Sequence, residues 1–216
     1  MDFRYLAIEG PIGVGKTTLA RHLGLRLDAA TILDETDNPF IADLYSGRPG
    51  AAFQAQLFSL LARHRQQSEL RQTDLFNQVT ISDYLFDKDR IYAYLNLDDN
   101  ELFIYQRLYD LLAADVVAPD LVVYLQAPSD VLRQRARRRR QRDATAPLPD
   151  DEYLGELNDA YNHFFFHYGD TPLLVVETSQ LAFDWDAAAM DDLVRQFRDM
   201  GRGTRYYVPR TGRTSP

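Results

Sequence analysis

The feature that most constrains this chain is a glycine-rich loop near its start. Residues 10–17 read Gly-Pro-Ile-Gly-Val-Gly-Lys-Thr and fit the pattern G-x-x-x-x-G-K-T. An apolar run at residues 5–8 predicts a strand before the loop, and Leu19, Leu23 and Leu27 lie on one face of the helix predicted after it. A glycine-rich turn between a strand and a helix directs backbone N–H groups at one anion. The chain is therefore expected to bind the phosphates of a nucleotide.

Each part of the loop has a chemical role in that binding. The glycines let the backbone turn its N–H groups inward, Lys16 supplies a positive charge for the β- and γ-phosphates, and Thr17 offers a hydroxyl group to Mg²⁺. ATP and Mg²⁺ are thus the expected cofactors. The residues expected to contact the nucleotide are Gly10, Pro11, Ile12, Gly13, Val14, Gly15, Lys16, Thr17 and Thr18.

Short apolar runs alternate with longer segments of helical period along the chain. This alternation predicts an α/β fold in which helices surround a parallel sheet. The five expected strands are residues 5–8, 31–33, 79–82, 121–125 and 173–176. The expected helices are residues 16–27, 38–45, 52–72, 85–96, 101–114, 129–140, 152–168 and 187–200.

The composition indicates one soluble domain. With 216 residues, 45% of them hydrophobic, the chain can bury the core of a single domain, expected at residues 1–200. Residues 201–216 are rich in Gly, Arg, Thr and Pro and are expected to be poorly ordered. No apolar run approaches the roughly 20 residues that span a membrane. Because neither a signal peptide nor a cysteine is present, a cytoplasmic location is expected.

The charge is negative overall but unevenly distributed. A net charge of −8 argues against nucleic acid as a partner, because phosphate backbones select for basic surfaces. Only two lysines occur, Lys16 and Lys88. A dense arginine cluster comprises Arg133, Arg135, Arg137, Arg138, Arg139, Arg140 and Arg142. A guanidinium cluster suits phosphate groups, with a solvated basic patch or an RNA contact as the alternative.

Two absences narrow the class of nucleotide-binding protein. GTP-binding switches usually carry N-K-x-D after a late strand, whereas Val176 is followed here by Glu-Thr-Ser-Gln. Motor and transporter ATPases usually end another strand with an acid, whereas the run at 121–125 leads to Gln-Ala-Pro. Both absences favour a small kinase.

The chain resembles the deoxynucleoside kinase family, and within it the bacterial deoxyadenosine/deoxyguanosine kinases. The resemblance covers about residues 5–178. It rests on the loop Ile-Glu-Gly-Pro-Ile-Gly-Val-Gly-Lys-Thr-Thr at 8–18, an acid after the second strand, a Gln…Arg helix, an acidic motif after the third strand and an arginine-rich lid at about 133–150. It implies a P-loop kinase fold with a five-stranded parallel sheet flanked by helices on both sides. It further implies a homodimer that phosphorylates the 5′-hydroxyl of a deoxyribonucleoside, purine favoured, in nucleotide salvage.

The resemblance assigns the general base to Glu35, which follows the second expected strand. Open α/β sheets bind their ligands at the carboxyl ends of the strands, and phosphoryl transfer uses a carboxylate that takes the proton of the attacking hydroxyl. Asp34 or Asp37 could take this role if the loop is displaced. A solvated loop acid is the remaining alternative.

The helix expected at 52–72 carries the residues that resemble the family's nucleoside pocket. Gln56 and Arg63 return to within about 20° of each other on a helix, whereas Gln54 and Arg63 are about 180° apart. Gln56 and Arg63 are therefore the pair expected to read the base, since amide and guanidinium groups match the edge of a flat ring. In this alignment Tyr45 falls where the family binds the sugar 3′-hydroxyl. An exposed polar helix face is the alternative.

The segment 81–90 occupies the place of the family's acid-Arg-Ser motif and departs from it. The alignment puts Asp83 on the acid that holds Mg²⁺ and contacts substrate, and Asp89 on the aspartate that reads the base beside Arg63. Tyr84 stands where the family has an arginine, so Arg90 or a lid arginine would have to replace it. An exposed acid or a helix cap is the alternative for either aspartate.

The lid supplies the last expected catalytic residues. Arg135 and Arg139 are four residues apart, share a helix face and are expected to reach over the phosphates together, with Arg142 following. They would act there with Lys16 of the loop. Two other functions remain open, a nucleoside monophosphate kinase such as thymidylate kinase and a regulatory protein that binds a nucleotide without transfer. Tyr84 speaks against the first, because a phosphorylated acceptor needs extra positive charge. The joint presence of Lys16, Thr17, Glu35 and the lid speaks against the second.

Overall fold

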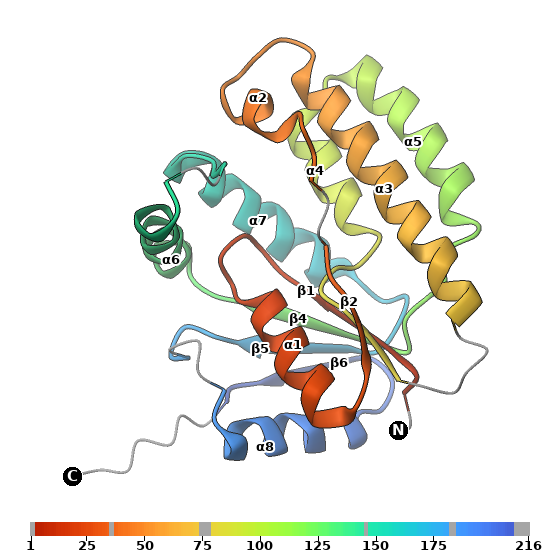
Figure 1. The fold of residues 1–216 in the computed structure, drawn as a ribbon, viewed down its shortest axis with the longest axis vertical. Coiled ribbons are helices and arrows are strands. Elements are labelled where there is room, and N and C mark those ends of the chain that lie inside the picture. The colour runs from red at the N-terminus through yellow and green to blue at the C-terminus, as the bar shows by residue number, and fades with distance from the viewer. Residues whose placement is uncertain (1–2, 35–36, 74–78, 145–146, 182–184, 210–216) are drawn as a thin grey trace.

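A computed structural model describes residues 3–34, 37–73, 79–144, 147–181 and 185–209. The strands form one six-stranded sheet in the order β2-β3-β1-β4-β5-β6, and neighbouring strands run parallel (Figure 1). Their bounds are β1 Tyr5–Glu9, β2 Ala30–Ile32, β3 Thr80–Ser82, β4 Leu121–Gln126, β5 Leu173–Glu177 and β6 Thr204–Tyr207.

The helices connect these strands and cover both faces of the sheet (Figure 1). They are α1 Lys16–Leu27, α2 Ile41–Tyr45, α3 Ala51–Thr73, α4 Lys88–Asn96, α5 Asp99–Ala113, α6 Ser129–Arg142, α7 Asp151–His167 and α8 Ala187–Arg198. Among the described residues, no helix is both long and apolar enough to cross a membrane.

Successive side chains of each strand enter different cores, because a strand alternates its side chains between the two faces of the sheet. In β1, Leu6 and Ile8 join the core formed with α1 and α8, where Leu23 and Phe197 are fully buried. Ala7 between them joins the opposite core, formed with α4 and α7. This two-sided burial explains why the strands read as short continuous apolar runs.

A further helical layer extends the α4 side. Leu60 of α3, Phe86 and Tyr105 of α5 form a separate buried cluster. Helix α5 begins with a capping box, in which Asp98 accepts hydrogen bonds from the N–H groups of Asn100 and Glu101. Figure 1 shows α3 and α5 side by side at the outer edge of this layer.

The five expected strands and all eight expected helices are present, and their bounds differ from the expected ones by at most three residues. The number of strands was wrong, because Thr204–Tyr207 adds a sixth strand in the segment expected to be poorly ordered. It pairs with β5 in register from Leu173↔Thr204 to Val176↔Tyr207. The glycines and arginines around this segment hid a short run of β-favouring residues.

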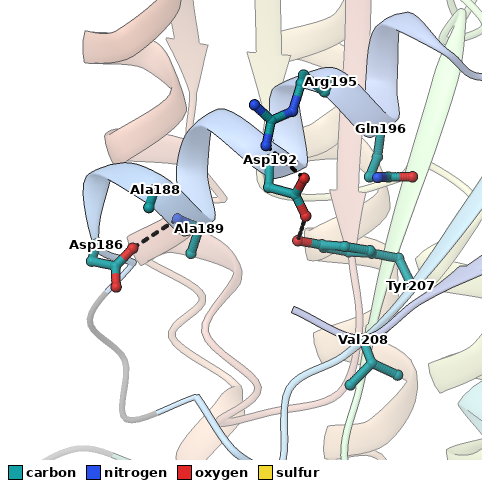
Figure 2. Close-up of a pocket in the computed structure, with 8 residues that line it drawn as sticks. All are labelled: Asp186, Ala188, Ala189, Asp192, Arg195, Gln196, Tyr207 and Val208. Atoms are coloured by element: carbon teal, nitrogen blue, oxygen red, sulfur yellow. Dashed lines mark hydrogen bonds and ion pairs between the residues drawn. The ribbon is translucent and has the colours of Figure 1, made fainter. Parts of the chain in front are cut away.

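Side-chain contacts hold the sixth strand to α8. The hydroxyl group of Tyr207 donates a hydrogen bond of 2.7 Å to Asp192, whose other oxygen accepts from Arg195 at 2.8 Å. Figure 2 shows these three side chains converging at a pocket between α8 and β6. Residues 204–207 are therefore part of the folded domain.

Candidate active site

The loop between β1 and α1 has the backbone needed to surround an anion. Gly13 and Gly15, the second glycine of the pattern, have φ 84° and 107°, in the region that residues with a Cβ adopt with difficulty. At Gly10 a Cβ would lie 2.4 Å from the carbonyl oxygen of Leu125, so the close approach of the loop to β4 requires glycine. The G-x-x-x-x-G pattern thus reflects two local constraints, a backbone turn and a contact with the neighbouring strand.

Lys16 folds back over this loop. Its Nζ donates to the carbonyl oxygens of Gly10 at 2.5 Å and Pro11 at 3.3 Å, and lies 3.8 Å from the carboxylate of Glu9. Burial lowers the pKa of Lys16 to about 8, although Glu9 acts in the opposite direction. The charge of a bound nucleotide would favour the protonated ammonium.

Glu9 is a buried carboxylate that sequence reasoning did not identify as functional. It accepts hydrogen bonds from the N–H groups of Gly10 and Leu85, both at 2.8 Å, and from the hydroxyl of Tyr161 at 3.1 Å. One side chain therefore joins the phosphate loop, the loop after β3 and helix α7. Its place at the end of β1, immediately before the glycine, is the sequence signal that would have found it.

Thr17 and Asp83 meet at the edge of the phosphate loop. The hydroxyl group of Thr17 donates to Oδ2 of Asp83, and the N–H of Asp34 donates to Oδ1 at 2.6 Å. Asp83 is only 3% exposed. A buried carboxylate beside a hydroxyl oxygen suits Mg²⁺, which binds one or two carboxylates together with phosphate oxygens.

An ion network lies next to Asp83. Arg63 donates two hydrogen bonds of 3.0 Å to the two oxygens of Asp34, and it also donates to Asp89. Lys88 pairs with the same Asp34. The expected pairing of Arg63 with Asp89 is thus present, and Asp34 and Lys88 are added to it.

Opposite charges set the pKa values in this network. Burial would raise the pKa of Asp34, but Lys88 and Arg63 hold it well below its usual range. Burial raises the pKa of Asp89 to about 6, and Arg63 offsets only part of this effect. Within the described part of the chain, Oδ2 of Asp89 has no hydrogen-bond partner. Asp89 therefore retains an unused position for a ligand atom.

The remaining residues of the expected nucleoside pocket lie around this network. Gln56 is buried on α3, on the same helix face as Arg63. The ring of Tyr45 packs against the ring of Tyr153, with 5.7 Å between the ring centroids. Tyr84 is fully buried, and its hydroxyl group accepts a hydrogen bond of 3.2 Å from Gln67. Glu35, the expected base, lies outside the described residues.

Arg135 and Arg139 both line the cavity that contains the phosphate loop, but the structure holds their side chains differently. The guanidinium group of Arg135 is buried and donates to the hydroxyl and carbonyl oxygens of Thr178, at 3.1 and 2.6 Å, and to the carbonyl of Leu181 at 3.0 Å. Arg139 is exposed. The two residues share a helix face, but contacts at the end of β5 hold Arg135.

The other lid arginines fall into two groups. Arg133 and Arg137 bind Asp151, and Arg140 donates to the carbonyl of Pro149, so these three hold the segment that follows α6. Arg138, Arg139 and Arg142 line, together with Arg135, a cavity of about 730 Å³. Its other walls include the phosphate loop with Lys16 and Thr17, together with Asp34, Asp83 and Lys88.

Comparisons of sequence give a consistent result. A family model described as deoxynucleoside kinase matches residues 6–200. The deoxyguanosine kinase of Bacillus subtilis is 34% identical over 139 residues, which are 62% of this chain and 66% of that protein. The deoxyadenosine kinase of Dictyostelium discoideum is 32% identical over 169 residues, 76% of this chain and 67% of that protein. The matched segments thus span about two thirds of either relative.

Solved structures agree on the fold. Deoxyadenosine kinase from M. mycoides with dATP bound covers 91% of this chain and 99% of that chain, with 23% identity and a TM-score of 0.72. The same enzyme with the products dCMP and a flexible dCDP covers 90% and 98%, with 22% identity and a TM-score of 0.73.

Proposed function

The chain belongs to the deoxynucleoside kinase family, and from this premise we propose that it transfers the γ-phosphate of ATP to the 5′-hydroxyl group of a deoxyribonucleoside. Members of this family are transferases that phosphorylate nucleosides. The family match favours this activity over the thymidylate kinase and regulatory alternatives. A role in nucleotide salvage accompanies the proposal.

The observation that carries the proposal is the composition of one cavity. The phosphate loop forms one part of it, the acidic pair Asp34 and Asp83 another, and the arginines of α6 a third. Phosphoryl transfer requires the same combination, because positive groups must neutralise charge on the transferring group while carboxylates serve the metal and the acceptor.

The reaction assigns a role to each group. As the 5′-oxygen forms its bond to the γ-phosphorus, the bond from that phosphorus to the bridging oxygen of the β-phosphate breaks and ADP leaves. Lys16 neutralises charge on the leaving group. The proton of the 5′-hydroxyl passes to Glu35, the proposed general base. Asp34 is a weaker candidate, since Arg63 and Lys88 already bind its carboxylate and hold its pKa low.

We also assign Mg²⁺ to Thr17 and Asp83. Their oxygens lie in contact at the edge of the phosphate loop and are of the type that Mg²⁺ prefers. When bound, the ion would neutralise charge on the β- and γ-phosphates. Asp83 is held for this task by the N–H of Asp34.

A purine is the proposed base, because two relatives above 30% identity are named for deoxyguanosine and deoxyadenosine. Gln56, Arg63 and Asp89 would read its edge, with Tyr45 at the sugar. Arg63 and Asp89 are 5% and 1% exposed, so the base would enter only if this network opens. The unused oxygen of Asp89 is the acceptor that an incoming amino group would meet.

Residues 1–200 are proposed to act as one domain with the segment at about 133–150 as its lid. Arg138, Arg139 and Arg142 face the cavity and are suited to the phosphates. A catalytic role for Arg135 stays a prediction, since its present contacts lie at Thr178 and Leu181.

A homodimer is proposed through α3 and α5. Large apolar side chains are exposed on these neighbouring helices, namely Phe58, Leu61, Phe103, Ile104 and Leu111. Exposed apolar patches of this kind mark interaction surfaces, and identical patches of two copies can pack around a two-fold axis. A cytoplasmic location fits an enzyme that uses the ATP pool, and neither nucleic acid nor membrane is a proposed partner.

The activity is tested by incubating the protein with ATP, Mg²⁺ and each of the four deoxynucleosides and measuring ADP and the monophosphate. We expect turnover with deoxyadenosine or deoxyguanosine. Lys16→Ala should abolish it while the circular dichroism spectrum stays unchanged, because the Lys16 charge serves bound phosphate. Near-normal kcat in this variant would refute the assignment of the loop.

A further inference from the structure

Lys88 lines the cavity that contains the phosphate loop, although it lies outside β1, the phosphate loop and α1. It is one of only two lysines in the chain, and both line this cavity. Its side chain is 9% exposed, pairs with Asp34 and has its Nζ 5.8 Å from the ring centroid of Tyr92. Burying an ammonium group is costly unless it is well paired. A buried lysine at this position therefore needs a structural or functional explanation.

Helix stability does not supply that reason. Lys88 is the first residue of α4, where the partial charge of the helix is positive and a cation is unfavourable. Asp34 compensates for this placement. Burial would lower the pKa of Lys88, but Asp34 outweighs that effect and raises it, so the ammonium remains charged.

The ammonium has donors left for a ligand. Nζ carries three N–H donors, and among the described residues its one recorded acceptor is Asp34. Asp34 and Lys88 both line the cavity that contains Lys16, Thr17 and Asp83. A charged donor is thus held beside the site of transfer.

We propose that Lys88 is a catalytic residue, whose ammonium binds the oxygens of the transferring phosphoryl group, and that Asp34 is the residue that positions it. The inference rests on the proposed kinase function and adds a second lysine to it. Three non-bridging oxygens of the phosphoryl group share negative charge while its bond to ADP breaks and its bond to the 5′-oxygen forms. A preorganised cation at this point stabilises the transition state.

Other cations near the third strand do not fill this role. Arg63 is engaged by both oxygens of Asp34 and by Asp89. Arg90, two residues after Lys88, lies 3.9 Å from Asp87 and 5.5 Å from the ring centroid of Tyr109, outside the residues that line the cavity. Lys88 is therefore the cation that stands in for the arginine that Tyr84 replaces.

Three variants test the proposal. Lys88→Gln keeps an N–H donor for Asp34 but removes the charge, Lys88→Arg keeps the charge, and Arg90→Gln is the matched control on the same helix. Each is examined by circular dichroism, by steady-state kinetics with ATP and the preferred purine deoxynucleoside, and by calorimetric binding of that nucleoside and of its 5′-monophosphate.

We expect kcat of Lys88→Gln to fall by roughly 10²–10³ while its affinity for the nucleoside changes little. Its affinity for the monophosphate should fall by about tenfold or more, because the product carries the phosphoryl group that Lys88 binds. Lys88→Arg should restore part of both losses, and Arg90→Gln should behave as the wild type. A purely structural lysine would affect nucleoside and monophosphate equally.

Two results would overturn the inference while leaving the kinase function intact. One is an active wild type with a folded Lys88→Gln variant of normal kcat. The other is an equal loss of affinity for nucleoside and monophosphate. If Lys88→Gln does not fold, the Lys88→Arg variant tests the role instead. The proposal is overturned if Lys88→Arg no longer binds the monophosphate more tightly than the nucleoside. An inactive wild type would instead refute the proposed function itself.

Discussion

Arg63 binds both carboxylate oxygens of Asp34, with two hydrogen bonds of 3.0 Å, although the residues are 29 positions apart. This bidentate contact ties the helix α3 to the loop after β2, at the carboxyl edge of the sheet. Because Lys88 pairs with Asp34 and Asp89 with Arg63, two anions and two cations form one buried chain. Asp34 is the link that both cations share.

Asp34→Asn is therefore expected to lower stability strongly. Removing one partner of a buried ion pair leaves an uncompensated charge, which costs about 3–5 kcal/mol in proteins. The matched control is Asp43→Asn, because Asp43 pairs with Arg48 at 2.8 Å on the surface, where such pairs contribute about 0–1 kcal/mol. Denaturant unfolding of both variants gives the comparison. Equal, small changes would contradict the importance of the network.

The two lid arginines should separate into different roles. Arg135→Met should lower the melting temperature, because Thr178 and Leu181 lose its three hydrogen bonds. Arg139→Met should leave the melting temperature unchanged and lower kcat, because its exposed side chain lines the cavity. Thermal melts and kinetics measure both, with the exposed Arg65→Met as a control for loss of charge. A fall in kcat for Arg135→Met without a change in melting temperature would instead support the catalytic role proposed for it.

Sequence patterns predicted those features of the site that depend on the local geometry of the backbone. The phosphate loop could be recognised because its glycine spacing follows from the positive φ of Gly15 and the contact between Gly10 and Leu125. Helical phase likewise placed Gln56 and Arg63 on one helix face, and the alignment with the family brought Asp89 to Arg63.

Long-range pairing could not be predicted in the same way. Asp34 and Lys88 are 54 residues apart, and no spacing rule relates them. The contact of Arg135 with Thr178 depends on how α6 packs against the end of β5, which a count of arginines does not reveal. The sixth strand forms because β5 offers a free edge to a short run of β-favouring residues, and composition alone reads that run as a loop.

The pKa of Asp89 predicts a pH dependence of stability between about pH 4 and 6. Burial raises this pKa to about 6, so the native state holds a proton that the unfolded chain, with a value of 3.8, has already released. The stability that protonated Asp89 contributes is therefore fully present below pH 4 and is lost as the pH rises through 6. The free energy of unfolding should change over this range by at most about 1.4 kcal/mol per pH unit. The difference in unfolding free energy between wild type and Asp89→Asn should change over this range. Parallel curves would contradict the raised pKa.

The sixth strand should contribute to stability. A chain that ends after Gly201 lacks β6, so the edge of β5 loses its ladder and Asp192 loses the hydroxyl of Tyr207. We expect a lower melting temperature than for a chain that ends after Pro209 and keeps the strand. The Tyr207→Phe substitution should lower the free energy of unfolding by about 0.5–1.5 kcal/mol, the usual contribution of one hydrogen bond. Identical melting of the two truncated chains would argue against an ordered strand.

Glu35→Gln tests the general base. Glutamine keeps the size and one acceptor oxygen of Glu35 but cannot accept the 5′-hydroxyl proton, so kcat should fall by roughly 10²–10⁴ while nucleoside binding and melting temperature persist. Asp34→Asn should differ by a large loss of stability, and its kcat should fall through Lys88, because its carboxylate is bound by Arg63 and Lys88. Asp37→Asn, at an exposed residue of the same loop, is the control for register. Normal kcat in Glu35→Gln together with an inactive but stable Asp37→Asn would move the base to Asp37. If kcat survived all three substitutions, base catalysis by this loop would have to be abandoned.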